Sequence, residues 1–199
     1  MLSRHYASDV DILDSDYQIA ETHLYYFYKT LEKMQKFIEE YNGDATKEMF
    51  DSEFSKEIVT KFIEVMDEDF NTSAAVANLH NIFKYANAIM NEAKKSTRQV
   101  TANTLAKMVK DIRKVYSVLG LLEQNPEKFI IELKEKYLKK LQISPKDIES
   151  FISERANAKK LKDYNRADSI RENLENKGII LNDTRDGTEW DIKALYKVF

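Results

Sequence analysis

The 199-residue sequence contains no cysteine. This absence excludes disulfide bonds, thiolate zinc sites and cysteine nucleophiles, although by itself it does not identify the compartment. The three histidines, His5, His23 and His80, lie far apart in the sequence and form no local metal-binding motif. We therefore expect no metal site in this chain and assign these histidines to packing or surface roles.

Glycine and proline are also scarce, with four and two residues. Four scattered glycines cannot form the phosphate-binding loops GxGxxG or GxxxxGK[ST]. Carboxylates are abundant, but no two stand out as an acid–base pair, so we identify no catalytic residue. No apolar run approaches the roughly 20 residues that cross a bilayer, and no signal peptide is recognisable. We therefore expect a cytoplasmic protein without membrane contact.

Long helices are expected where glycine and proline are so few. Apolar residues recur at steps of three and four in four segments, 17–41, 54–65, 76–93 and 101–119, and each segment has one apolar stripe. Consecutive amphipathic helices with short connections predict an antiparallel helical bundle over residues 1–120. The charge-dense segment 121–143 is helical by propensity and is interpreted as a connecting helix.

A new unit is predicted from residue 144 to residue 199. Ser144 and Pro145 have the chemistry of a helix start, and this helix is expected to run to about Lys162. Asp163 caps a second helix that ends at Gly178, and the segments IILN and GTEW, joined through Asp186-Gly187, predict a β-hairpin. The predicted fold class is therefore mainly α, a helical bundle followed by a small α+β domain of two helices and a β-hairpin.

The last unit carries the side chains that suggest a function. The net charge of the chain is −3, so a polyanion must be held by a local basic patch. Such a patch is offered by four basic residues near the end of the first of the two helices, Arg155, Lys159, Lys160 and Lys162. In the second helix, Tyr164, Asp168 and Arg171 step by four and three along one flank, beside the buried stripe.

This combination suits single-stranded RNA. Lysine and arginine bind phosphates, an exposed aromatic ring stacks on an unpaired base, and a carboxylate accepts hydrogen bonds from base edges. A simpler interpretation is an ion pair between Asp168 and Arg171 beside a solvated lysine face, and the spacing alone favours it. Both interpretations stay open on the residues themselves.

Three segments resemble cysteinyl-tRNA synthetases, in the order in which they occur in that family. Residues 155–190, RANAKKLKDYNRADSIRENLENKGIILNDTRDGTEW, are similar to the C-terminal end of the family. Residues 62–82, FIEVMDEDFNTSAAVANLHNI, resemble the Asp-Asp-Asp-Phe-Asn-Thr helix start of its helical DALR domain. Residues 3–12, SRHYASDVDI, resemble the His-Tyr-Arg-Ser-Pro segment that leads into that bundle. Together, the three matches cover nearly the whole chain.

The resemblance implies a role in reading tRNA. The anticodon contacts of the family fall on Lys159, Tyr164, Asp168 and Asp183, and Lys160 and Arg171 are expected to add RNA contacts. Lys159 replaces the arginine of the better-known bacterial pattern and loses its bidentate geometry, while Tyr164 replaces a tryptophan with a smaller stacking face. The implied partner is the anticodon stem-loop of tRNA(Cys).

The resemblance also accounts for the absence of catalytic motifs. The nucleotide-binding fold of these synthetases, with its HIGH and KMSKS sequences and its zinc site, precedes the His-Tyr segment and is not found in this sequence. We therefore expect no cofactor in this chain, with ATP, magnesium and zinc implied for the missing N-terminal catalytic domain, which would be a second partner. The chain alone is expected to be inactive.

Other functions remain possible on sequence grounds. A free-standing helical module that binds a protein partner would need no RNA affinity, and a general RNA chaperone would show no preference among tRNAs. The related ligases that attach cysteine to sugar precursors are less compatible, because they lack the C-terminal anticodon unit. Trp190 is assigned to closing the hairpin over the helix pair, and a contact of Trp190 with RNA is the less favoured alternative.

Overall fold

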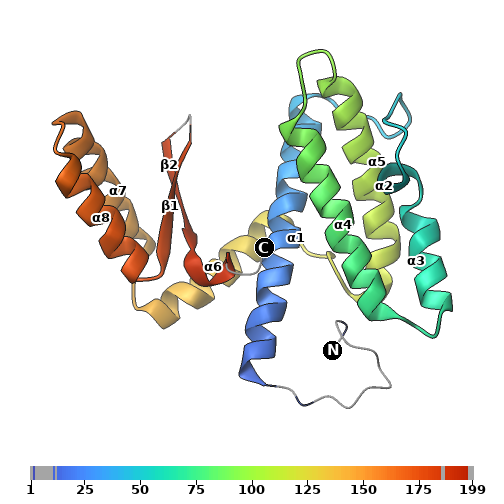
Figure 1. The fold of residues 1–199 in the computed structure, drawn as a ribbon, viewed down its shortest axis with the longest axis horizontal. Helices are drawn as coiled ribbons and strands as arrows, with labels where there is room; N and C mark the ends of the chain where they lie inside the picture. The colour runs from blue at the N-terminus through green and yellow to red at the C-terminus, as the bar shows by residue number, and fades with distance from the viewer. Residues whose placement is uncertain (1, 3–10, 12, 185–186, 197–199) are drawn as a thin grey trace. The chain divides into compact units, whose positions relative to one another are not determined.

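The computed structural model describes residues 2, 11, 13–184 and 187–196 of the chain. The segment SRHYASDVDI lies outside the described residues except for Asp11, and the turn residue Asp186 lies outside them as well. The described residues form eight α-helices followed by one two-stranded antiparallel sheet (Figure 1). The predicted fold class, a helical bundle followed by two helices and a hairpin, is therefore confirmed.

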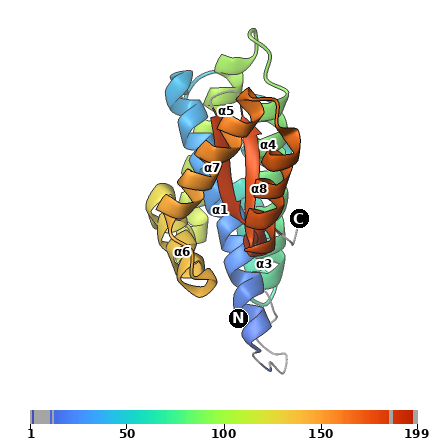
Figure 2. The same cartoon turned by 90° about the vertical axis from the view of Figure 1, so that its left-hand side faces the viewer.

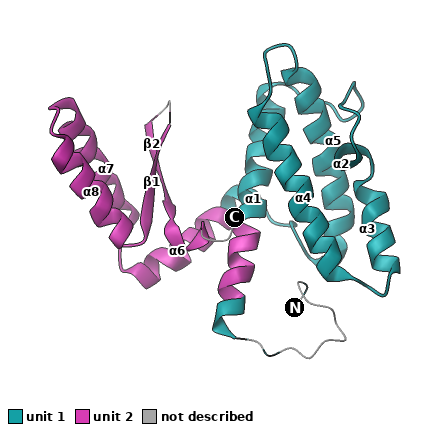
Figure 3. Cartoon of the chain, in the orientation of Figure 1, with its two compact units in different colours: residues 1–16, 26–128 teal, residues 17–25, 129–199 magenta. Residues whose placement is uncertain are grey.

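The chain divides into two compact units (Figure 3). The first comprises Met1–Asp16 and Tyr26–Lys128, and the second comprises Tyr17–Tyr25 and Phe129–Phe199. The long helix α1, Asp14–Glu40, contributes residues to both units. The predicted domain boundaries, 1–120, 121–143 and 144–199, stay a prediction.

The first unit is built from most of α1 and from helices α2 to α5, with the bounds Glu53–Lys56, Ile58–Asp67, Thr72–Asn91 and Arg98–Tyr116. The helix predicted over residues 54–65 is divided into α2 and α3, which meet at Glu57. A short 3-10 turn, Ser117–Leu119, extends α5 and ends at Gly120, whose φ of 68° is the left-handed conformation that glycine adopts without strain.

Aromatic residues from several helices fill the core of the first unit. The rings of Phe27 in α1 and Phe83 in α4 are stacked with centroids 5.4 Å apart. Tyr116 at the end of α5 lies edge-on to Phe62 of α3 and donates a hydrogen bond to the Ala75 carbonyl of α4, at 2.9 Å. These contacts join helices that are distant in sequence, as a helical bundle requires.

The buried residues of α1 differ from the single predicted stripe. Tyr17 is exposed although its position belongs to that stripe, whereas Tyr25 and Tyr28 are buried. The physical reason is that α1 serves two units, so different faces are covered along its length. Tyr25 belongs to the second unit and contacts Asp191 within it, whereas Tyr28 belongs to the first unit and accepts a hydrogen bond from Gln124 of that unit.

The second unit contains helix α6, Pro126–Leu141, from Phe129 onward, and then α7, Pro145–Lys160, and α8, Tyr164–Asn176. Strand β1, Ile179–Thr184, pairs with β2, Gly187–Ile192, so that Thr184 is opposite Gly187. Figure 2 shows α7 and α8 side by side in front of the hairpin, and in both views the two helices cover one of its faces.

Local sequence signals set the ends of these helices. Ser144 caps α7 with a capping box to Asp147, and Pro145 is the first helical residue. The Asp163 side chain caps α8 by accepting a hydrogen bond from the Arg166 amide. After α8, Gly178 adopts a φ of 83°, which reverses the chain into β1. The predicted start of α8 is confirmed, and its buried face consists of Ala167, Ile170 and Leu174.

Candidate nucleic-acid interface

The end of α7, the start of α8 and the end of β1 lie at one end of the second unit (Figure 1), and most of the predicted RNA-binding residues belong to these segments, whereas Arg171 lies in the middle of α8. The α7–α8 connection is short, and Lys162 within it adopts a positive φ of 61°. Because α7 and β1 run toward the same end, the last turn of α7 reaches the end of β1. The Lys159 ammonium group contacts the Asp183 carboxylate at 2.9 Å.

Helix α8 presents its predicted flank to solvent. Tyr164, Asp168 and Arg171 are exposed, while the neighbouring residues of the apolar face are buried against the rest of the unit. Tyr164 is 62% exposed, which leaves its ring available for stacking. Leu161, three residues earlier in the α7–α8 connection, is 81% exposed. No role for Leu161 was predicted from the sequence.

Asp168 and Arg171 do not form the ion pair that their spacing allows. Within the described part of the chain, neither side chain has a hydrogen bond or an ion pair. The charge of Asp168 does reach Arg155, because it contributes to raising the pKa of that guanidinium, after the larger effect of the Asp183 hydrogen bond. Asp168 is therefore an exposed carboxylate near a cation, with its acceptor oxygens unoccupied by the described residues.

Arg155 is the residue for which the structure departs most from the sequence interpretation. It was expected in the exposed basic cluster, but it is buried, with 4% of its side chain exposed. Its two terminal nitrogens bind the two oxygens of Asp183, at 2.8 and 3.0 Å. This bidentate geometry is the one that arginine forms best with a carboxylate. Arg155 is therefore engaged with Asp183 and does not present its charge to a phosphate.

The Asp183 carboxylate is the centre of a cluster formed with Arg155, Lys159 and Thr188. Besides Arg155 and Lys159, it accepts a hydrogen bond from the Thr188 hydroxyl at 2.8 Å, and Thr188 is its direct partner across the hairpin. The hydrogen bonds from Arg155, Lys159 and Thr188 together hold the pKa of Asp183 well below its usual range. Sequence reasoning missed Thr188, although its position opposite Asp183 in the predicted hairpin was the available signal.

Trp190 lies on the part of β2 that faces α6. The ammonium group of Lys134 lies 4.5 Å from the centre of the Trp190 ring and donates a hydrogen bond to the Trp190 carbonyl at 2.9 Å. This cation–π contact and the half-buried position of Trp190 agree with a structural role.

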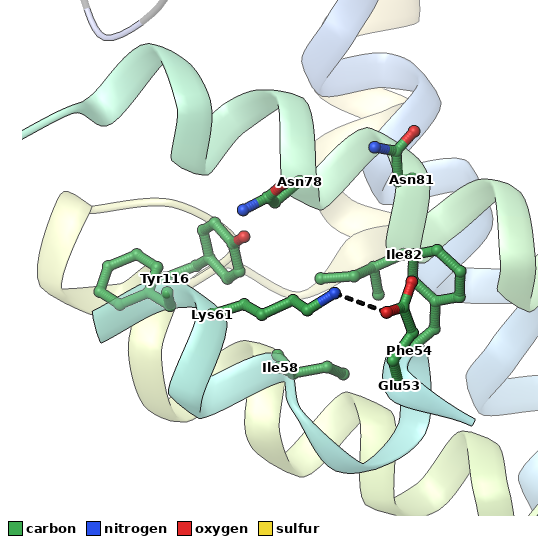
Figure 4. A pocket seen from close by; sticks show the side chains of 9 residues that line it. Glu53, Phe54, Ile58, Lys61, Asn78, Asn81, Ile82 and Tyr116 are labelled. Carbon is green, nitrogen blue, oxygen red and sulfur yellow. Dashed lines mark hydrogen bonds and ion pairs between the residues drawn. The ribbon is translucent and has the colours of Figure 1, made fainter. Parts of the chain in front are cut away.

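A cavity of about 120 Å³ lies in the first unit, lined by side chains of α2, α3, α4 and the end of α5 (Figure 4). Its lining includes the apolar side chains of Ile58 and Ile82, an ion pair between Lys61 and Glu53 at 2.7 Å, and the polar side chains of Asn78 and Asn81. Small-molecule sites usually enclose roughly 300–1,000 Å³. The cavity is smaller, and it is not formed by the predicted RNA-binding residues, which belong to the second unit.

The described residues contain no group of three or more His, Cys, Asp or Glu residues arranged to hold a metal ion. Among them, there is also no helix with the length and apolar character needed to cross a membrane.

Comparison with known proteins gives matches along the chain. The model of the DALR domain matches residues 61–123, which include α3 from Lys61, α4 and α5. The cysteine–tRNA ligase of Geotalea uraniireducens is 35% identical over 206 aligned residues, which cover 97% of this chain and 41% of the relative. Over nearly its whole length, the chain is similar to cysteine–tRNA ligases, and residues 61–123 are similar to the DALR domain.

Other cysteine–tRNA ligases match to a similar extent. The ligase of Geobacter metallireducens is 36% identical over 97% of this chain and 40% of its own length. The ligase of Acinetobacter baumannii strain SDF is 34% identical over 96% of this chain and 37% of its own length. The chain thus spans about two fifths of the length of the curated relatives that it matches. The predicted resemblance to cysteinyl-tRNA synthetases and their DALR domain is confirmed.

Proposed function

We propose that this chain is the tRNA-reading part of a cysteine–tRNA ligase and that its second unit binds the anticodon stem-loop of tRNA(Cys). The observation that carries the proposal is the exposed flank of α8, where Tyr164 and Asp168 lie on the same side as the basic end of α7. An aromatic ring, an acceptor and several cations at one end of a rigid helix pair suit a single-stranded loop.

Each predicted residue has a distinct role in this proposal. Lys159, Lys160 and Arg171 contact the phosphate groups of the loop, which fixes the register of the RNA. Tyr164 stacks on an unpaired base. Asp168 and Asp183 accept hydrogen bonds from base edges of the GCA anticodon, with Asp168 the more accessible of the two acceptors. These assignments rest on exposure, charge and the resemblance to the family.

The chemical steps would depend on the catalytic domain of the intact ligase. There, cysteine would be activated with ATP and transferred to the 3′ end of tRNA(Cys), with magnesium and zinc as cofactors. The present chain contributes none of the motifs for that chemistry, so we propose that it needs no cofactor of its own and is inactive alone. We further propose that it acts in the cytoplasm, in protein synthesis. Adenylate formation by the isolated chain would contradict the proposal that it is inactive alone.

The proposal is tested by measuring binding of the 199-residue chain to RNA stem-loops. A loop with the GCA anticodon should bind more tightly than loops with one anticodon base replaced, and footprinting on total tRNA should protect the anticodon loop of tRNA(Cys). Equal affinity for all tRNAs would favour an RNA chaperone. Capture of a protein partner that survives RNase treatment, without any tRNA affinity, would favour a protein-binding module.

A further inference from the structure

The carboxylate of Asp183 has no spare acceptor position. A carboxylate offers about four lone-pair sites, two on each oxygen. Oδ1 accepts from one terminal nitrogen of Arg155 and from the Thr188 hydroxyl, and Oδ2 accepts from the other nitrogen of Arg155 and from Lys159. All four sites are therefore filled by the chain itself. A base that reads Asp183 must displace one of these donors.

The donors differ in how easily they can leave. Arg155 is buried and bound through two parallel hydrogen bonds, so its departure would leave a buried cation unpaired. The Lys159 side chain is 43% exposed and makes a single contact with Asp183, and water can replace that contact at small cost. Lys159 is thus the donor to Asp183 that can be exchanged most easily.

We propose, on the basis of the proposed anticodon binding, that Arg155 is a positioning residue that fixes the Asp183 carboxylate, so that a base edge can replace Lys159 at Oδ2. An N–H group of the base then donates to Oδ2, and the released Lys159 ammonium binds a backbone phosphate. Arg155 stays in place and sets the direction in which the carboxylate accepts. One ion pair in the free protein is thereby exchanged for a base contact and a phosphate contact.

A second observation supports a positioning role for Arg155. Its Nε atom is buried and has no hydrogen-bond partner among the described residues. A buried donor without a partner reduces stability, so a residue selected only for folding would not be expected to retain one. Arg155 is also the cation whose pKa both Asp183 and Asp168 raise. Of these two carboxylates, the guanidinium is hydrogen-bonded to Asp183, and Asp168 acts on it only through its charge.

The test compares two substitutions in the full chain, Arg155→Lys and Lys159→Ala, on stem-loops with the GCA anticodon and with single-base variants. Arg155→Lys keeps the charge but removes the two-pronged geometry. We expect it to reduce the preference for the GCA loop about tenfold or more and to leave the salt dependence of binding unchanged. Lys159→Ala should weaken binding to all loops similarly and reduce the salt slope by about one.

A double substitution shows whether Arg155 acts through Asp183. If it does, Arg155→Lys combined with Asp183→Asn should lower base preference no further than Asp183→Asn alone. Lys193→Ala, which removes an exposed ion pair with Glu175, is the matched control. It should change neither the preference for the GCA loop nor the salt dependence of binding. If Arg155→Lys does not fold, the paired change Arg155→Met with Asp183→Leu, which leaves no buried charge unpaired, should bind RNA with the same reduced base preference as Asp183→Asn, because Asp168 is still present.

The outcomes separate this inference from the proposed function. If the wild-type chain binds no stem-loop, the proposed function fails. If the wild type prefers the GCA loop and Arg155→Lys keeps that preference, the positioning role of Arg155 is wrong. It is also wrong if Arg155→Lys weakens binding to all loops equally, in proportion to its loss of thermal stability. Loss of base preference in Lys159→Ala would overturn the exchange at Oδ2.

Discussion

The Tyr25 hydroxyl in α1 donates a hydrogen bond to the buried carboxylate of Asp191 in β2, a residue 166 positions later in the chain. The same carboxylate oxygen accepts from the Ile192 amide and lies 3.3 Å from the Lys134 ammonium group of α6. Because α1, α6 and β2 meet at this carboxylate, Asp191 joins the α1 segment Tyr17–Tyr25 to the hairpin within the second unit.

The substitution Tyr25→Phe tests whether the hydrogen bond to Asp191 stabilises the protein. The substitution keeps the ring but removes a donor to a buried carboxylate, so we expect the free energy of unfolding to fall by about 1–3 kcal/mol. Chemical denaturation followed by circular dichroism measures the change. Tyr17→Phe, at an exposed tyrosine of the same helix, is the control and should be neutral. Equal stability of the two variants would show that the hydroxyl contributes nothing.

Acidification should weaken the cluster around Asp183. Because Arg155, Lys159 and Thr188 hold the pKa of Asp183 below its ordinary value of 3.8, the unfolded chain binds the proton more readily than the folded one. The contribution of Asp183 to stability is therefore complete above the ordinary pKa and is lost as the pH falls below it toward the folded-state value.

The measurement compares unfolding of the wild type and Asp183→Asn at about pH 6 and about pH 3. The difference in unfolding free energy between the two proteins should be larger at the higher pH. The neighbouring substitution Asn182→Ala removes no titrating group, and its effect should be the same at both pH values. A difference for Asp183→Asn that stays constant with pH would contradict the role of its ion pairs.

Tyr164 should contribute stacking without contributing to stability. Tyr164→Ala is expected to weaken binding to the stem-loop by about 1–3 kcal/mol, the usual contribution of one stacked base, and Tyr164→Phe should retain most of the affinity. Thermal unfolding should be unchanged, because the ring is exposed. Tyr17→Ala removes another exposed tyrosine and is the control. Equal affinity of Tyr164→Ala and the wild type would exclude stacking.

Asp168 should affect base choice rather than affinity in general. Removal of a carboxylate near RNA favours all loops by electrostatics, so the informative quantity is the ratio of affinities between anticodon variants. Asp168→Ala should reduce that ratio by an amount equivalent to about 1–3 kcal/mol. Glu172→Ala, at another exposed acid of α8, is the control. The same change of affinity for every loop would show that Asp168 acts only through its charge.

Local signals in the sequence predicted the elements of the second unit well. The cap at Asp163, the capping box at Ser144 and the glycine after α8 are confirmed, because each depends on side chains within a few residues of one another. The exposure of Tyr164, Asp168 and Arg171 also followed from helical spacing. Such features need no knowledge of the tertiary structure.

The features that sequence reasoning missed depend on residues that are distant in the chain. Arg155 looks like one more basic residue of an exposed cluster, and only its packing against a strand 28 residues later turns it into the buried partner of Asp183. The two buried faces of α1 could not be predicted either, because one apolar stripe was visible while Tyr25 is buried through its contact with β2. The RNA-binding roles of the residues remain predictions.

The sharing of α1 between the units has a practical consequence for protein engineering. A graft of residues 129–199 onto another scaffold would carry Lys134 and Asp191 but not Tyr25, which comes from the stretch Tyr17–Tyr25. In the transplanted segment, the Asp191 carboxylate, which is buried in the native chain, would lose its hydrogen bond from Tyr25 and become exposed to water. A transferable copy of the second unit must therefore be assembled from two separate stretches of the gene.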